Sequence, residues 1–174
     1  MEPGISLCMI VKNESQYLRP CLESIKPFVD ELIIVDTGSA DDTIAIAKEF
    51  GAKVSSFVWC DDFSAARNES LKYATKEWIL VLDADEQLIS SDINALKTLL
   101  QDPSLKASEV LGFQLDQRTY SKVSTPKSLP NLVKHPLVSK YPYYVSHKLV
   151  RLFKNTPKIS YRYTIHELVE PSIR

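Results

Sequence analysis

Two carboxylates one residue apart, Asp83 and Asp85, are the best candidates for chemistry in this chain. They follow the apolar run 78–82, a pattern that indicates a buried strand. Hard oxygen ligands suit Mg²⁺ or Mn²⁺, and such an ion can bridge to a diphosphate and neutralise the charge of a departing group. Asp-x-Asp pairs also occur in ordinary exposed turns. The position of this pair directly after a predicted strand is what favours a functional role.

A third carboxylate, Asp36, follows a second predicted strand at residues 31–35, which is apolar from residue 32 onward. A carboxylate there can accept hydrogen bonds from ribose hydroxyls or from a base N–H, as the ribose-binding acid of dinucleotide folds does. The alternative is a plain turn or capping aspartate. Asp41 already suits the cap of the next helix, which leaves Asp36 free and favours the nucleotide-binding role.

These carboxylates are set in a regular alternation of short apolar runs and amphipathic stretches. Asn13 or Ser15 is expected to cap the first helix, and Pro27 to stop it. Alternation at this spacing predicts parallel βαβ units, and therefore an α/β fold with a doubly wound, mostly parallel central sheet flanked by helices. In such sheets ligands bind beyond the carboxyl ends of the strands. Strands are expected at residues 5–11, 31–35, 53–58 and 78–82, and helices at 43–50 and 63–74.

The later part of the chain is less regular. A helix is expected at 92–100 and strands at 110–117, 148–153 and 159–165. The Pro-, Ser- and Lys-rich segment 121–144 is typical of a long functional or mobile loop. We expect residues 1–174 to form a single domain, with the candidate carboxylates in a regular half at 1–87 and a less regular half at 88–174. Because the chain ends at Arg174, soon after the last candidate residues, that second half is expected to be truncated or minimal.

Composition sets further bounds on function. A length of 174 residues with 44% hydrophobic content suits one α/β domain with a substantial core. A formal charge of −1 without an evident basic stripe argues against a nucleic-acid partner. Three cysteines without metal-ligand spacing indicate reduced thiols, and the place of Cys8 in an apolar run predicts a buried, inert thiol there. With neither a secretory leader nor a membrane-length apolar run, we expect a cytoplasmic protein, and peripheral attachment at the inner face of the membrane stays open.

Two common nucleotide-binding classes are disfavoured by missing glycines. A dinucleotide fold needs a glycine-rich turn after its first strand, whereas this chain has Lys-Asn-Glu-Ser at 12–15. The whole chain contains only four glycines and no Walker-type loop. A carboxylate-based site for a nucleotide diphosphate is what remains.

Three segments, 6–14, 35–43 and 82–86, resemble family 2 glycosyltransferases. Trp59 with residues 62–68 resembles, more narrowly, the branch that includes bacterial lipopolysaccharide-core and peptide glycosyltransferases. The resemblance is closest from residue 5 to about 87 and looser from 110 onward, although 151–153 and 165–167 share it. It implies a GT-A fold and inverting transfer from a nucleotide-diphospho-sugar to a saccharide, lipid-linked or peptide acceptor, as in the synthesis of cell-envelope polysaccharide. By this resemblance, residues 1–174 would be a single nucleotide-sugar-binding catalytic domain, with a donor-binding half at 1–87 and an acceptor-side half at 88–174.

The resemblance also assigns roles to donor-site residues. Val11 and its neighbours Asn13 and Glu14 would line the nucleoside pocket, and Asp36 would contact base or ribose. Asp83 and Asp85 would handle the diphosphate and a Mn²⁺ or Mg²⁺ ion. Apart from the resemblance, the adjacency of Glu86 to this pair favours a supporting role over that of an alternative general base. Thr37 stands where many members carry a second aspartate, so the nucleotide, UDP among the candidates, is open. For Arg67, contact with phosphate and an ion pair with Asp83 have equal weight.

Inverting transfer also requires a general base that takes the acceptor's proton. Glu167 is the candidate by position and by looser resemblance, and His166 could orient it, take the proton itself or bind the metal. The alternative is an ordinary polar pair at a strand end. Two rival functions remain: a metal-dependent nucleotidyltransferase, which normally has a glycine-rich basic loop, and a non-catalytic nucleotide-sugar-binding module. Nothing in the sequence indicates an oligomeric state.

Overall fold

The computed structural model describes residues 2–106 and 108–173, so Arg174, at the end of the chain, lies outside it. The described residues group into two compact units. One unit comprises residues up to 113 together with those from 151 onward, and the other comprises residues 114–150. The expected division into a donor-binding and an acceptor-side half at residue 87 stays a prediction.

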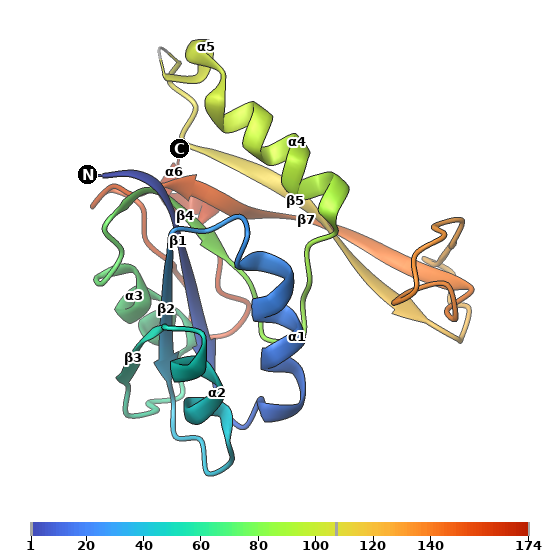
Figure 1. The fold of residues 1–174 in the computed structure, drawn as a ribbon, viewed down its shortest axis with the longest axis horizontal. Helices are drawn as coiled ribbons and strands as arrows, with labels where there is room; N and C mark the ends of the chain where they lie inside the picture. The colour runs from blue at the N-terminus through green and yellow to red at the C-terminus, as the bar shows by residue number, and fades with distance from the viewer. Residues whose placement is uncertain (1, 107, 174) are drawn as a thin grey trace. The chain divides into compact units, whose positions relative to one another are not determined.

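A central sheet with the strand order β3-β2-β1-β4-β7-β5 carries the fold (Figure 1). The first four strands in chain order pair in parallel, whereas β7 pairs antiparallel with β4, and the short β6 pairs antiparallel with β7. The predicted mostly parallel sheet is therefore confirmed. The strands are β1 (Glu2–Val11), β2 (Glu31–Asp36), β3 (Lys53–Ser56), β4 (Lys76–Val81), β5 (Gly112–Ser121), β6 (Leu129–Pro130) and β7 (Tyr143–Lys154).

Three helices connect the parallel strands. The chain steps from β1 to β2 to β3 and then returns across the sheet to β4, so right-handed crossovers place α3 on the face opposite to α1 and α2. The connecting helices are α1 (Ser15–Ile25), α2 (Thr43–Glu49) and α3 (Phe63–Leu71). Later in the chain come α4 (Ser90–Gln101), α5 (Pro103–Lys106) and α6 (Glu170–Ile173). None of the helices within the described residues is long and apolar enough to cross a membrane.

The core lies on both faces of the parallel strands. Strands covered by helices on both faces are expected to be apolar throughout, and Ile33, Ile34 and Val35 are accordingly consecutive and fully buried. The helices add apolar stripes of their own, such as Leu18, Leu22 and Ile25 on α1. Other side chains that are fully buried in the sheet include Leu7, Cys8, Met9, Leu80, Leu152 and Phe153.

The cysteines are all free thiols in the structure. Cys8 is buried in β1, as expected, and burial raises the pKa of its thiol to about 12. Cys21 on α1 is also buried, whereas Cys60 is exposed. The expectation of an inert thiol at Cys8 fits a group that stays protonated at neutral pH.

The predicted cap of α1 is wrong. The N-cap residue is Glu14, and it makes no side-chain cap bond. Instead, the loop before α2 satisfies the free backbone donors, because Ser15 N–H donates to Asp41 Oδ2 (3.1 Å) and Glu14 N–H to Thr43 Oγ1 (2.7 Å). The two loops lie side by side at the edge of the sheet, so a neighbouring loop can replace the local cap.

The segment predicted as a strand at 159–165 is not one. Only an isolated antiparallel bridge joins Arg162 to Leu168. Tyr163 and His166 have positive φ values of 77° and 56°, which bend the chain back on itself and prevent an extended strand. The candidate base therefore lies in a short bridged loop.

Candidate active site at the carboxyl edge of the sheet

The parallel strands bring the predicted carboxylates to one edge of the sheet. Strand β1 lies between β2 and β4, with Val11 opposite Asp36 and Cys8 opposite Val81 (Figure 1). The connections that follow β1, β2 and β4 consequently leave the sheet at the same edge. This is the point at which the strand order reverses, where ligands bind in doubly wound folds. The expectation that Asp36 and Asp83 share this edge is confirmed.

Asp36 is buried, and its carboxylate holds its own turn. Oδ2 accepts a hydrogen bond from Gly38 N–H (3.0 Å), and both carboxylate oxygens accept one from Ser39 N–H (3.1 and 3.2 Å). Gly38 adopts a φ of 108°, which suits glycine. The expectation that Asp36 is free of turn bonds is therefore wrong, and its contact with base or ribose stays a prediction.

The neighbouring connection, between β1 and α1, is braced against the same turn. Asn13 has a φ of 56°; its N–H donates to Ser39 Oγ (2.9 Å) and its Oδ1 accepts from Ala40 N–H (2.8 Å). Asn13 therefore orders the loop opposite it and does not cap the helix.

Thr37, directly after β2, makes two further hydrogen bonds to the end of β1. Its N–H and its hydroxyl both donate to the carbonyl of Val11, at 2.9 and 3.1 Å. A carboxylate in this buried position would face that carbonyl without a proton to donate, so a hydroxyl suits the position better than an aspartate would.

Asp83 is held by two arginines. Its Oδ1 accepts from Arg67 Nη2 at 2.5 Å, and its Oδ2 from Arg151 Nη2 at 3.2 Å. Burial raises the pKa of this carboxyl, but the charges of Arg67 and Arg151 outweigh burial, and the net pKa is lowered. Asp83 is therefore ionised at neutral pH with both oxygens engaged. The structure shows the ion pair that the sequence left as one of two alternatives for Arg67.

Arg67 joins three parts of the chain. Its buried side chain projects from α3, and its Nε donates to Glu167 Oε1 at 2.7 Å while Nη2 binds Asp83. The guanidinium lies 5.7 Å from the centroid of the Tyr161 ring. Its Nη1 is buried without a hydrogen-bond partner among the described residues. One guanidinium thus brings Glu167 next to the carboxylate pair at the end of β4.

Arg151 and its partner Glu86 complete the network. Arg151 Nη2 donates to Glu86 Oε1 at 2.7 Å, and Glu86 Oε2 accepts from Asp83 N–H at 2.9 Å. Burial is the main cause of the raised pKa of the Glu86 carboxyl. The support expected from Glu86 is thus present, whereas a role for Arg151 was missed. The available signal was a charged residue inside the apolar run 149–153.

Asp85 differs sharply from Asp83, two residues away. Its side chain is exposed and has no hydrogen bond or ion pair within the described part of the chain. Nearby, Glu14 has a raised pKa, caused first by burial and then by the charges of Asp85, Asp41 and Asp83. The carboxylates at this edge therefore repel one another, an arrangement that a bound cation would relieve.

The donor set fits a divalent cation only in part. Asp85 has free carboxylate oxygens, but those of Asp83 are engaged, and the described residues contain no group of three ligating side chains. Mg²⁺ and Mn²⁺ sites commonly combine one or two carboxylates with phosphate oxygens and water. The site thus fits an ion that arrives with a diphosphate better than one held by the protein alone.

The two candidate base residues differ in how they are placed. Glu167 is half-buried against Arg67, with 15% of its side chain exposed. His166 is exposed, and its side chain makes no hydrogen bond or ion pair with the described residues. The structure therefore brings Glu167, and not the side chain of His166, into the network around Asp83.

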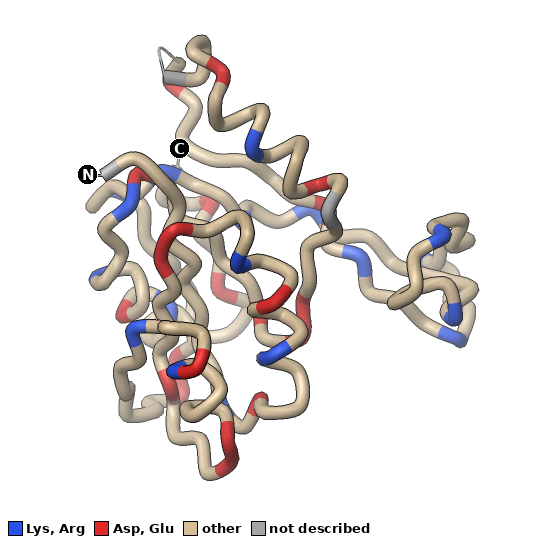
Figure 2. The backbone as a smooth tube through the Cα atoms, viewed as in Figure 1, with Lys and Arg blue, Asp and Glu red and all other residues tan. Residues whose placement is uncertain are grey.

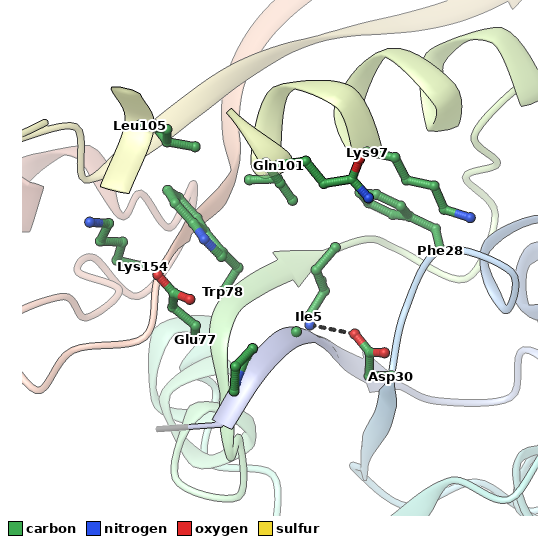
Figure 3. Close-up of a pocket in the computed structure, with 12 residues that line it drawn as sticks. Ile5, Phe28, Asp30, Glu77, Trp78, Lys97, Gln101, Leu105 and Lys154 are labelled. Atoms are coloured by element: carbon green, nitrogen blue, oxygen red, sulfur yellow. Dashed lines mark hydrogen bonds between the residues drawn. The ribbon is translucent and has the colours of Figure 1, made fainter. Parts of the chain in front are cut away.

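A cavity of about 330 Å³ lies elsewhere, at the opposite edge of the strands (Figure 3). Ile5 and Trp78, near the starts of β1 and β4, face Lys97 and Gln101 of α4 across it. Of the two carboxylates that line it, Asp30 accepts a hydrogen bond from the N–H of Ile5 at 2.8 Å. None of the predicted site residues lines this cavity, so it is separate from the carboxylate edge.

Known proteins share this sequence pattern over most of the chain. The family described as Glycosyl transferase family 2 matches residues 6–159. A TPR repeat-containing protein of Synechococcus elongatus is 43% identical over 171 residues, which cover 97% of this chain and 36% of that protein. The glycosyltransferase SunS of Bacillus subtilis is 44% identical over 85 residues, 48% of this chain and 20% of SunS. The chain thus spans about a third and a fifth of these two relatives.

Solved structures agree on the fold. Residues 1–349 of S. aureus TarS superpose with a TM-score of 0.61 at 18% identity, covering 93% of this chain and 50% of that one. The complex of that protein with UDP-GlcNAc gives a TM-score of 0.50 at 23% identity over 57% of this chain and 31% of the other. The narrower likeness to the lipopolysaccharide-core branch stays a prediction. With nearly the whole length matched by the family, this chain belongs to glycosyl transferase family 2.

Proposed function

We propose that this chain is the donor-binding catalytic domain of an enzyme that transfers a sugar, with inversion, from a nucleotide-diphospho-sugar to an acceptor. The observation that carries the proposal is the contrast at the end of β4. Asp83 is fixed between Arg67 and Arg151, whereas Asp85 remains exposed beside it. TarS, which shares the fold, has been crystallised with UDP and with UDP-GlcNAc, which supports a UDP-sugar as the donor.

The donor would bind across the edge formed by the ends of β1, β2 and β4. Asp36 would contact the base or ribose, and the Val11–Glu14 connection would line the nucleoside pocket. Asp85 would hold a Mn²⁺ or Mg²⁺ ion, which supplies positive charge against the diphosphate. Asp83 would be a positioning residue, because its bonds to Arg67 and Arg151 fix the turn from which Asp85 projects.

Glu167 would serve as the general base. The acceptor's oxygen forms a bond to the anomeric carbon as the bond from that carbon to the diphosphate breaks, and the acceptor's proton passes to the carboxylate of Glu167. Arg67 orients Glu167 through the 2.7 Å contact with its Oε1, which leaves Oε2 to accept the proton. His166, exposed next to it, is the alternative base. The acceptor, whether saccharide, lipid-linked or peptide, stays a prediction, and so does a cytoplasmic location.

Release of UDP from UDP-sugars, by transfer or by slow hydrolysis, tests the catalytic part of this proposal. Glu167→Gln should lower turnover by about 100-fold or more, the usual contribution of a general base, while nucleotide binding is retained. Glu109→Gln, at an exposed carboxylate outside the site, is the matched control and should leave turnover unchanged.

Other outcomes separate the rival functions. If Glu167→Gln leaves turnover intact and His166→Ala abolishes it, His166 is the base. Tight nucleotide binding without turnover of any UDP-sugar would favour a binding module without catalysis.

A further inference from the structure

Residues 114–150, hereafter the basic unit, differ in charge from the rest of the chain. They contain six Lys and Arg residues and a single acidic residue, Asp116, which gives a formal charge of +5. Because the whole chain has a charge of −1, the remaining residues carry −6. Figure 2 shows the contrast as blue segments along this unit. The six cationic side chains are all exposed: Arg118, Lys122, Lys127, Lys134, Lys140 and Lys148.

The basic unit also exposes apolar side chains. None of its residues is buried. Leu132 is 84% exposed, Val123 68%, and Leu129 and Leu137 48% each. Four half-exposed tyrosines accompany them, at positions 120, 141, 143 and 144. Aliphatic groups, amphipathic rings and lysines together in one short segment are unusual for a surface in contact only with water.

Local hydrogen bonds hold this surface in place. The side-chain amide of Asn131 donates to the carbonyls of Val138 and Tyr141, both at 2.8 Å, and closes the loop that carries Leu132 and Leu137. The turn between residues 125 and 128 is closed by the Ser128 N–H to the carbonyl of residue 125 at 3.0 Å. The exposed apolar groups are therefore presented by closed loops with lysines among them.

We propose that the basic unit binds a bilayer surface that contains anionic lipids. Its lysines would contact lipid headgroups, its leucines and valine would enter the boundary with the acyl chains, and its tyrosines suit the level of the headgroups. A nucleic acid would satisfy the lysines but would leave the exposed aliphatic side chains without apolar partners. Binding to a bilayer would not depend on sugar transfer. The net charge of the whole chain is close to zero and therefore does not reveal the positive charge of this unit.

Co-sedimentation of the full chain with vesicles tests the proposal. Vesicles of phosphatidylcholine with phosphatidylglycerol should bind the protein, and pure phosphatidylcholine should bind it far more weakly. Replacing Lys122, Lys127, Lys134 and Lys140 together by glutamine should lower the partition coefficient by about 100-fold or more, since each basic residue near the surface contributes a several-fold effect. The matched control replaces Lys26, Lys48, Lys97 and Lys158, exposed lysines outside the unit, and should leave binding unchanged.

A second variant separates the apolar contribution. Leu132→Ser with Leu137→Ser keeps the charge and should weaken the binding that remains at high salt, where electrostatic attraction is screened. The proposal fails if both lysine variants lose the same affinity, if neutral vesicles bind equally well, or if no vesicle binds. RNA binding without vesicle binding would identify a nucleic-acid partner instead. Circular dichroism of each variant, compared with the wild type, verifies that the chain is folded.

Discussion

Charged residues are placed in opposite ways at the carboxyl edge of the sheet, where Asp36 and Asp83 lie, and in the basic unit. At the edge, Arg67 and Arg151 are buried and paired with Asp83, Glu86 and Glu167. In the basic unit, six cations are exposed and the only acidic residue is Asp116. Buried pairing fixes geometry, which suits a site that must orient reacting groups. Exposed charge of one sign instead suits attraction to an anionic surface.

Truncating one leucine in each region should give the largest difference. Leu80→Ala, at a fully buried position in β4, should lower the free energy of unfolding by about 3 kcal/mol, through lost burial and the cavity left behind. Leu132→Ala, at an 84% exposed position, should change it by less than about 0.5 kcal/mol. Urea unfolding measures both. A comparable loss for Leu132→Ala would mean that the basic unit has a stabilising core, and would remove the contrast.

The sequence predicted the carboxyl edge of the sheet well, because apolar runs and strand ends are local signals. The runs at 31–35 and 78–82 located two strands, and therefore the edge on which Asp36 and Asp83 lie. The link from Arg67 to Glu167 and the links made by Arg151 could not be found in that way. Glu167 is 100 residues from Arg67, and Arg151 is 68 from Asp83, so their contacts depend on how the loop and β7 pack onto the sheet.

The basic unit and the turn at Asp36 show two other limits of the sequence. Composition averaged over the chain gave a charge of −1 and hid a segment of +5. For Asp36, the sequence offered a role in the turn or a role in nucleotide binding. The nucleotide-binding role was favoured because Asp41 suited the cap of the neighbouring helix. Asp41 does bind that helix at Thr43 N–H (3.0 Å), yet Asp36 still bonds its own turn.

Removing the central cation should have the next largest effect. Arg67→Met leaves Glu167 and part of the charge of Asp83 without a partner in a largely buried site, and should cost about 2–3 kcal/mol in unfolding free energy. Lys72→Met breaks the exposed pair with Glu69 and should cost less than about 0.5 kcal/mol. Thermal and urea unfolding measure the two variants side by side. Equal losses of unfolding free energy in the two variants would show that burial of the arginine network does not increase its contribution to stability.

The last contrast concerns the pH dependence of stability at the opposite edge of the sheet. Glu31 accepts bonds from Ser6 Oγ, Lys53 Nζ and Thr75 N–H. Burial alone would raise the pKa of this carboxyl, but Lys53, Ser6 and Thr75 lower it to about 2. The stability that this shift contributes is present above pH 4.5 and is lost as pH falls toward 2.

Glu31→Gln should therefore flatten the decline of stability between those two pH values. Asp116→Asn, in the basic unit, is the control and should leave the slope unchanged. Urea midpoints measured across this pH range give both slopes, and an unchanged slope in Glu31→Gln would show that the bonds to Glu31 do not shift its titration.

Calorimetric titration of UDP and UDP-sugars, with and without Mn²⁺, tests the central claim most directly. The wild type should bind in a Mn²⁺-dependent manner, and Asp85→Ala should abolish that dependence, whereas Asp92→Ala, at an exposed aspartate on α4, should not. Because Asp85 is exposed and unpaired, its removal should leave the fold intact. Equal Mn²⁺-dependent binding by Asp85→Ala, or no nucleotide binding by the folded wild type, would contradict a donor site at this edge.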